Sequence, residues 1–450
     1  MTSFSSAASG PARPVASSLW RDADFRRLWV GQTASQLGEQ ASLVVLPLFA
    51  VLTLHAGAGQ LGVLRAVGQA PILLLSLLAG AWVDRWRTRT LMVVTDAGRA
   101  LALGATAVAG LLGLLGLPAL LVVAFVVGAL SVFFDVAYQA SLVRLVHRDQ
   151  LVQGNSALEG SRSAAQIGGP ALGGALVSAL SAPVAAASGA VFFTCSFLSI
   201  RRMRRRDSVP AGPRTPDPAV PPGAGARPAS AGPERPARLR RRIAEGLRFV
   251  AGDASLRTVC LASAAFQFFF AAVMTAYLLF LPRDLRLSGA AVGAALAATG
   301  PGALLGSVLA ARLPGRFGHG PVLVWAAALG DGVFLLVPAL HGPPVTTVPA
   351  LLAVGFVFGA FGQLVNVTIM AVRQSVAPDG MQGRVAATIS FVGMGTTPFG
   401  SLLGGLLAQV WGPRTGLAAA AAGMLLSPVL MALSPLARLG RTLPGGPVGS

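Results

Sequence analysis

The 450-residue sequence contains no lysine, only two cysteines and only 16 acidic residues. Charged residues make up 11% of the chain, whereas a soluble domain of ordinary composition carries roughly a quarter. Hydrophobic residues make up 54%, and the mean hydropathy is +0.69. Because a soluble fold of this composition would expose too much apolar surface to water, the composition excludes a soluble protein and predicts an integral membrane protein.

Several function classes lack the residues that they need. The net charge of +19 does not indicate nucleic-acid binding, since the arginines cluster between apolar segments and not on one helix face among aromatics. Cys195 and Cys260 lie inside apolar runs, with neither metal-site spacing nor a disulfide framework. The first apolar segment contains Glu39 and lacks a small-residue cleavage site, so no cleaved signal peptide is expected.

The sequence also contains no motif that indicates an enzyme. No phosphate-binding loop of the Walker type occurs, which excludes ATP-driven transport by this chain. Four histidines are scattered at loop positions: His55, His147, His319 and His341. We therefore expect a protein that is not an enzyme and that uses no cofactor or metal.

Long apolar runs are what the chain has instead. A membrane-spanning helix needs about 20 mostly apolar residues to cross about 30 Å of hydrocarbon. Twelve segments meet this requirement, near 28–53, 61–83, 90–113, 118–142, 163–181, 183–200, 256–282, 288–313, 320–340, 346–371, 385–410 and 414–434. The prediction is an all-α integral membrane protein with twelve transmembrane helices in two pseudo-symmetric six-helix bundles.

A proline- and arginine-rich region separates the two sets of six spans. It has too little apolar content to pack, and its last part, ARLRRRIAEGLRFV, is typical of a basic amphipathic helix on anionic lipid headgroups. The predicted division is a tail over 1–19, an N-terminal bundle over 20–202, a cytoplasmic linker with this helix over 203–254, a C-terminal bundle over 255–436 and a tail over 437–450.

The arginines predict the orientation. Alternate connections between spans carry most of them, the connection with Arg283 and Arg286 being the main exception. Because positively charged loops stay on the cytoplasmic side, we expect a multi-pass protein of the cell membrane with both termini in the cytoplasm.

The two halves share short motifs. DQLVQG at 149–154 precedes the fifth span and DGMQG at 379–383 precedes the eleventh. PALGG at 170–174 recurs loosely as Pro398-Phe399-Gly400 with Gly404-Gly405. Parallel repeats of six spans are typical of transporters in which two bundles rock around a site at the midplane of the bilayer.

Between the second and third spans lies GAWVDRWRTRT, which resembles the cytoplasmic signature of the major facilitator superfamily. The matching positions are Gly80, Asp84, Arg85 and Arg89. This chain departs from the signature in two places, with Arg87 where a second glycine is usual and Ala310 in place of the acid in the second half. FRRLWVGQTASQLGEQ, VAYQASLVRLVHRDQLVQGNSALEGSR and GGPALGG resemble the branch with bacterial siderophore exporters and macrolide-efflux-like drug:proton antiporters, and the likeness covers about residues 20–436.

The resemblance implies a gate at this signature. Asp84 would meet the start of span eleven, near Arg384, when the transporter is closed to the cytoplasm. A contact that forms in one state alone biases the equilibrium by about 1–3 kcal/mol. The alternative is a topology anchor, which explains the arginines and leaves the acid unexplained. Asp96 and Arg99 are expected to pair with each other or with the group of Asp84 in a cytoplasmic charge network.

Ionisable residues inside spans are costly and usually functional. Glu39 lies near the middle of span one, which lines the cavity in this superfamily together with spans four, seven and ten. The resemblance therefore implies a proton-carrying or cation-binding carboxyl group, the alternative being a structural one. Asp135 is either a second coupling acid or the partner of an arginine such as Arg162. Asp331 is expected to be structural.

Polar residues on the spans expected to line the cavity can bond to substrate or bridge helices. They are Gln36, Tyr138, Gln267, Tyr277, Gln363 and Asn366. Gly169, Pro170, Gly173 and Gly174 resemble the proline-glycine motif of antiporters, which bends a helix and permits close packing.

These cavity spans offer few strong donors and no obvious basic residue for an anionic substrate. This argues against uptake of a sugar or peptide. The resemblance implies a monomeric, proton-coupled exporter of a small hydrophobic drug, antibiotic or secondary metabolite. The alternatives are a siderophore exporter, an uptake symporter and a non-transporting sensor.

Overall fold

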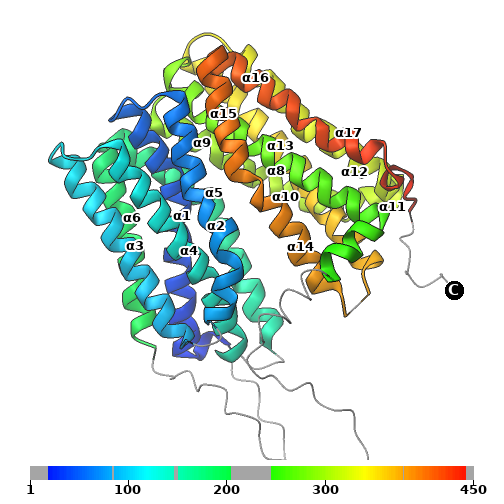
Figure 1. The fold of residues 1–450 in the computed structure, drawn as a ribbon, viewed down its shortest axis with the longest axis horizontal. Coiled ribbons are helices and arrows are strands. Elements are labelled where there is room, and N and C mark those ends of the chain that lie inside the picture. The colour runs from blue at the N-terminus through cyan, green and yellow to red at the C-terminus, as the bar shows by residue number, and fades with distance from the viewer. Residues whose placement is uncertain (1–18, 84–85, 146–149, 204–244, 379, 442–450) are drawn as a thin grey trace, which may run out of the picture.

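The computed structural model describes residues 19–83, 86–145, 150–203, 245–378 and 380–441. Helices make up nearly all of this part of the chain, and it contains no strand. Figure 1 shows two helical bundles side by side, the first formed by the N-terminal half and the second by the C-terminal half. The predicted fold class is thereby confirmed.

The N-terminal bundle contains six long helices and follows a short 3-10 turn, η1 (Leu19–Arg21). They are α1 (Ala23–Leu52), α2 (Ala58–Val83), α3 (Thr88–Leu111), α4 (Leu117–Leu145), α5 (Leu151–Ala179) and α6 (Ala182–Arg201).

The C-terminal bundle has the same plan, but three of its six spans are interrupted by a one-residue break, and a fourth changes from an α-helix to a 3-10 helix. The elements are α8 (Ala254–Arg283), α9 (Gly289–Ala297) with α10 (Thr299–Ala310), the short α11 (Leu313–Phe317), α12 (His319–Gly332) with η3 (Val333–Ala339), α13 (Pro344–Val376), α14 (Gln382–Gly395) with α15 (Thr397–Trp411), α16 (Pro413–Met424) with α17 (Leu426–Ala432), and η4 (Pro435–Arg438).

The first helices of the two bundles start in the same way. The carboxylate of Asp22 accepts hydrogen bonds from the backbone amides of Asp24 (2.8 Å) and Phe25 (3.4 Å) and caps α1. The carboxylate of Asp253 caps α8 by accepting from the amide of Leu256 at 2.8 Å. An aspartate satisfies amides that have no partner within the helix and complements the positive end of its dipole. The repeat thus extends to the helix starts.

Eleven helical segments of the described chain are long and apolar enough to cross a membrane. The predicted fifth span is the one that is absent from this set, although α5 is a continuous helix of 29 residues. Its first half, LVQGNSALEGSR, is polar, so α5 starts twelve residues before the predicted limit of 163. Part of α5 therefore needs a polar environment, which lipid does not supply.

Glycines bring the bundles together at the ends that the arginine pattern predicts to be extracellular. A Cβ on Gly174 of α5 would lie 2.2 Å from the carbonyl oxygen of Gly289 and 2.8 Å from Cα of Gly293 in α9. Gly62 of α2 approaches Gly405 of α15 as closely. Small residues permit such backbone contact between membrane helices. In Figure 1 the bundles converge at the end with α9 and α16 and diverge toward the end with α14, so this structure is closed at the predicted extracellular end.

The proline-glycine motif of α5 serves two contacts at once. Gly169 and Gly173 pack against the backbone of α1, while Gly174 faces the other bundle. In the second half, Gly400 and Gly404 of α15 pack against α8 in the same manner. The repeat read from the sequence thus corresponds to equivalent helix contacts in the two bundles.

Residues 245–252, the described end of the predicted linker helix, are helical. Val250 is buried in a cluster with Leu256, Val385 and Ile389, and a Cβ on Gly246 would lie 2.7 Å from Oγ1 of Thr388. This part of the linker therefore packs on the C-terminal bundle beside α14. Contact with lipid headgroups stays a prediction.

Candidate functional site

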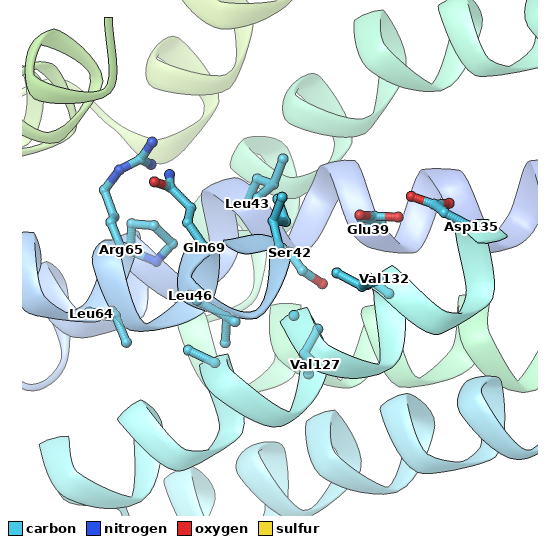
Figure 2. A pocket seen from close by; sticks show the side chains of 16 residues that line it. Glu39, Ser42, Leu43, Leu46, Leu64, Arg65, Gln69, Val127, Val132 and Asp135 are labelled. Carbon is cyan, nitrogen blue, oxygen red and sulfur yellow. The ribbon is translucent and has the colours of Figure 1, made fainter. Parts of the chain in front are cut away.

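A cavity of ≈ 180 Å³ lies within the N-terminal bundle between α1, α2 and α4 (Figure 2). Its charged side chains lie toward the two ends, with mostly apolar residues and Ser42 between them. The lining residues are Glu39, Ser42, Leu43, Leu46, Pro47, Leu64, Arg65, Gly68, Gln69, Ile72, Ala124, Val127, Gly128, Ser131, Val132 and Asp135.

Two carboxyl groups form one end of this cavity. Figure 2 shows the side chains of Glu39 on α1 and Asp135 on α4 pointing toward one another. The side chain of Glu39 keeps 24% of its surface exposed, so it is accessible from the cavity. Arg162, the arginine considered as a partner of Asp135, interacts with that carboxyl group electrostatically and also lies 4.0 Å from Glu159 on its own helix. Two facing acids repel each other when both are ionised, so such a pair favours holding a proton.

Arg99 of α3 lies behind Glu39, with its Nη1 3.9 Å from Oε2 of that carboxylate. The guanidinium is completely buried between the rings of Phe134 and Phe193, 4.4 and 4.3 Å from their centroids. Its Nη1 donates to the hydroxyl of Ser131 at 3.2 Å, and that serine also lines the cavity. A buried cation is thus in contact with the acidic end of the cavity.

Asp96 completes this network. Its carboxylate pairs with Arg99 one turn later on α3 and accepts from the hydroxyls of Ser196 at 2.5 Å and Ser35 at 3.3 Å. Asp96 and Arg99 have no exposed surface. The predicted pair of Asp96 and Arg99 therefore forms inside the bundle, where serines of α1, α4 and α6 supply further bonds. The group of Asp84, the other partner considered, lies outside the described residues.

The opposite end of the cavity carries a positive charge that the sequence reading missed. Arg65 and Gln69 of α2 lie side by side there in Figure 2. The Nε of Arg65 is buried without a hydrogen-bond partner, and the amide oxygen of Gln69 accepts from the hydroxyl of Ser401 in the other bundle at 3.1 Å. The spans considered from the sequence were one, four, seven and ten, whereas Arg65 belongs to the second span and lines the cavity as well.

The C-terminal bundle holds a second cavity, of ≈ 320 Å³, between α8, α12, α13, α14 and α17. Two of the predicted substrate-binding residues, Gln267 and Asn366, line it. Asp331, expected to be structural, also lines it, as does Arg373.

The other predicted substrate-binding residues lie outside the linings of these two cavities. Gln36 is buried in α1, and Tyr277 is buried in the core with its ring edge-on to Phe334. Tyr138 packs among apolar residues of the N-terminal bundle, and Cβ of Gln363 is in contact with Gly306 of α10. Their proposed contact with substrate stays a prediction.

Part of the signature motif falls outside the described residues. Asp84 and Arg85 lie there, whereas Gly80 belongs to the last turn of α2. Arg89 donates from Nε to the carbonyl of Ile200 at 3.3 Å and from Nη2 to that of Arg201, so it binds the carboxyl end of α6. Arg384 at the start of α14 pairs with Glu245 of the linker helix at 2.8 Å.

Two six-helix bundles that enclose cavities with charged side chains define a helical membrane transporter. In the described part of the chain no group of three or more histidine, cysteine or acidic residues can hold a metal ion. The model of the Major Facilitator Superfamily matches residues 28–281, more than half of the chain, and a second model described as a transmembrane secretion effector matches residues 226–442. The chain belongs to the major facilitator superfamily, which confirms the resemblance seen at GAWVDRWRTRT.

Relatives of known name are similar over most of their length. The chain is 27% identical over 418 residues to the multidrug efflux pump Tap of Mycolicibacterium fortuitum, covering 89% of this chain and 93% of that one. It is 28% identical over 399 residues to Tap of Mycobacterium tuberculosis, covering 83% and 84%. An uncharacterized MFS-type transporter of Bacillus subtilis, YfiS, is 26% identical over 395 residues, covering 85% and 86%.

Solved structures share the fold. A bacterial homologue of the iron transporter ferroportin superposes with a TM-score of 0.69 at 18% identity, over 92% of this chain and 98% of that one. A bacterial homologue of the lysosomal transporter Spinster gives 0.70 at 13% identity, over 94% and 98%. At these identities the likeness establishes the arrangement of helices and no more.

Proposed function

We propose that the protein is a proton-coupled antiporter that exports small, largely hydrophobic molecules such as drugs, antibiotics or secondary metabolites. The observation that carries this proposal is the acidic end of the N-terminal cavity, where Glu39 is exposed to the cavity, faces Asp135 and has Arg99 behind it. The relatives named as multidrug efflux pumps support the direction and the breadth of substrates.

The mechanism follows from the charges around Glu39. Arg99 favours the ionised form of this carboxyl group, whereas burial and the facing Asp135 favour the protonated form. Because these influences oppose one another, a small change in the surroundings of Glu39 is enough for its carboxyl group to bind or release a proton. A substrate that enters the cavity releases the proton, and reprotonation from the other face of the membrane resets the carrier.

In an alternating-access cycle the cavity opens in turn to each face of the membrane. The bundles meet through glycines at the predicted extracellular end, so the structure corresponds to the state that loads substrate from the cytoplasm. Separation of Gly174 from Gly293 and of Gly62 from Gly405 opens the opposite face. The predicted orientation, with both termini in the cytoplasm, makes the cytoplasm the loading side.

The test is an efflux screen of dyes, macrolides and siderophores in a pump-deficient host, followed by transport in reconstituted vesicles under an imposed pH gradient. Glu39→Gln is expected to insert and fold and to lose gradient-driven transport, while it keeps exchange of substrate at equilibrium. Glu159→Gln, on a side chain that is 70% exposed, is the matched control and is expected to transport like the parent. Gradient-driven transport by Glu39→Gln at the parental rate refutes the coupling role.

Arg65 favours a second candidate within the same fold, the export of a siderophore or another molecule with an acidic group. Its charge lies at the far end of the same cavity from Glu39. An arginine at membrane depth usually has a functional partner, and the acidic group of such a substrate can be that partner.

A further inference from the structure

A buried acid of the C-terminal bundle, Asp331, forms no ion pair with the described residues. Asp331 on α12 is 5% exposed, and its Oδ2 has no hydrogen-bond partner. The described residues bring no arginine or histidine into an ion pair with it. An ionised carboxylate removed from water is strongly unfavourable without a partner. Asp331 is therefore either kept protonated by burial or ionised beside a cation that comes from outside the chain.

The N-terminal bundle gives the comparison. Asp96, on the equivalent helix α3, is equally buried but is bonded to Arg99, Ser35 and Ser196. The equivalent helix of the N-terminal bundle thus carries a buried acid for which the chain provides partners. At Asp331 the chain provides a cavity instead.

That cavity has the size and lining of a ligand site. Its ≈ 320 Å³ lies within the range of small-molecule pockets. Phe266 lines it and forms one end of a stack with Phe270, with centroids 5.4 Å apart. Met394 and Met431 add adaptable apolar surface. Aromatic faces attract cations and thioethers tolerate varied shapes, so the lining suits a bulky apolar cation.

The cavity extends from Asp331 toward the predicted cytoplasmic end. Gly330 packs against Phe361 and Gly362 of α13, which sets the depth of Asp331. Arg373, which lines the other end, follows Gly362 by about three helical turns, roughly 16 Å along the axis. Arg373 forms no ion pair with Asp331 among the described residues, so both charged side chains line the cavity without neutralising each other.

We propose that this cavity is a binding site for lipophilic organic cations, with the carboxylate of Asp331 as the counter-ion and Phe266 as the aromatic wall. The proposal rests on the proposed export function, because it names one substrate class. It adds a site in the second bundle that is separate from the proton-coupling pair Glu39 and Asp135.

The experiment measures equilibrium binding of tetraphenylphosphonium to the purified full-length protein in detergent, with neutral triphenylphosphine oxide as the matched probe. Asp331→Asn keeps the shape and removes the charge. It is expected to weaken tetraphenylphosphonium binding at least tenfold and to change binding of the neutral probe less than twofold. Asp331→Glu keeps the charge and is expected to bind the cation within about threefold of the parent.

Two results overturn the proposal: unchanged cation binding by Asp331→Asn, or an equal loss of both probes in a variant that remains monodisperse. Should Asp331→Asn not fold, Phe266→Leu serves instead. It is expected to weaken cation binding about three- to tenfold with the neutral probe unchanged, and equal binding of the cation to parent and variant overturns the proposal.

The outcome is separable from that of the export proposal. Asp331→Asn is expected to keep gradient-driven transport of a neutral substrate, which Glu39→Gln loses. A failure at Asp331 alone leaves proton coupling standing. A failure at Glu39 alone leaves the cation site measurable by binding.

Discussion

The guanidinium of Arg99 lies 3.9 Å from a carboxylate oxygen of Glu39 while it pairs with Asp96 on its own helix. One cation therefore connects an acid that is exposed to the cavity with an acid that has no exposed surface. Protonation of Glu39 removes one of the negative charges around Arg99, and serines of α1, α4 and α6 bond to the same network. A proton that binds to Glu39 therefore changes the electrostatic interactions of a network that joins α1, α3, α4 and α6.

Arg99→Leu is expected to destabilise the protein strongly, because Asp96 then stays buried without a cation. Breaking one partner of a buried ion pair costs about 3–5 kcal/mol. The double variant Asp96→Asn/Arg99→Leu is expected to recover part of this loss, since it removes both charges. Melting of the purified variants in detergent measures the effect. If Arg99→Leu has the same melting temperature as the parent, this role of the pair is contradicted.

Gly174→Ala is expected to prevent closure at the predicted extracellular end, because its Cβ would lie 2.2 Å from the carbonyl oxygen of Gly289. Transport should fall at least tenfold, and spin labels on the α1–α2 and α8–α9 connections should move apart. Gly160→Ala is the control on the same helix, since nothing lies within 4 Å of that Cβ position. If both variants behave alike, the glycine contact does not limit the cycle.

Asp84→Asn is expected to slow turnover by about 5- to 150-fold while substrate binding changes less than twofold, as a gate worth 1–3 kcal/mol requires. Asp84 itself lies outside the described residues, and in this structure Arg384 pairs with Glu245. Both partners of that pair are 37% exposed, so Glu245→Gln should cost less than about 1 kcal/mol. Equal turnover of Asp84→Asn and the parent reduces the signature to a topology anchor.

Arg65→Gln is expected to reduce transport of substrates with an acidic group at least tenfold and to leave neutral substrates within about twofold. Arg65→Lys keeps the charge but loses the planar pair of donors, so an intermediate loss is expected. Competition between an acidic substrate and its methyl ester in vesicles measures the selectivity. An equal loss for acid and ester assigns Arg65 to helix packing.

Composition and hydropathy predicted the spans well because lipid demands long apolar helices. The predicted limits 118–142 and 256–282 lie inside α4 and α8. The start of α5 was missed by twelve residues, since its polar first half does not read as a span. The glycines at 173–174 predicted close packing, and the structure gives helix partners both to them and to their counterparts at 404–405.

The site was harder to predict, because it depends on which helices become neighbours. Glu39 and Asp135 stand out as acids inside apolar runs, and their position in one cavity follows from the contact of α1 with α4. A single arginine such as Arg65 hardly changes the mean hydropathy of its span, so hydropathy alone does not single it out. The cavity beside Asp331 could not be predicted from the sequence, since its lining comes from five different helices.

The most direct test of proton coupling is proton release on substrate binding by the purified protein in weakly buffered detergent near neutral pH. With a substrate from the efflux screen, the parent should release protons on binding, whereas Glu39→Gln should bind the substrate and release none. Binding to the parent without proton release, or equal release from Glu39→Gln, contradicts the account.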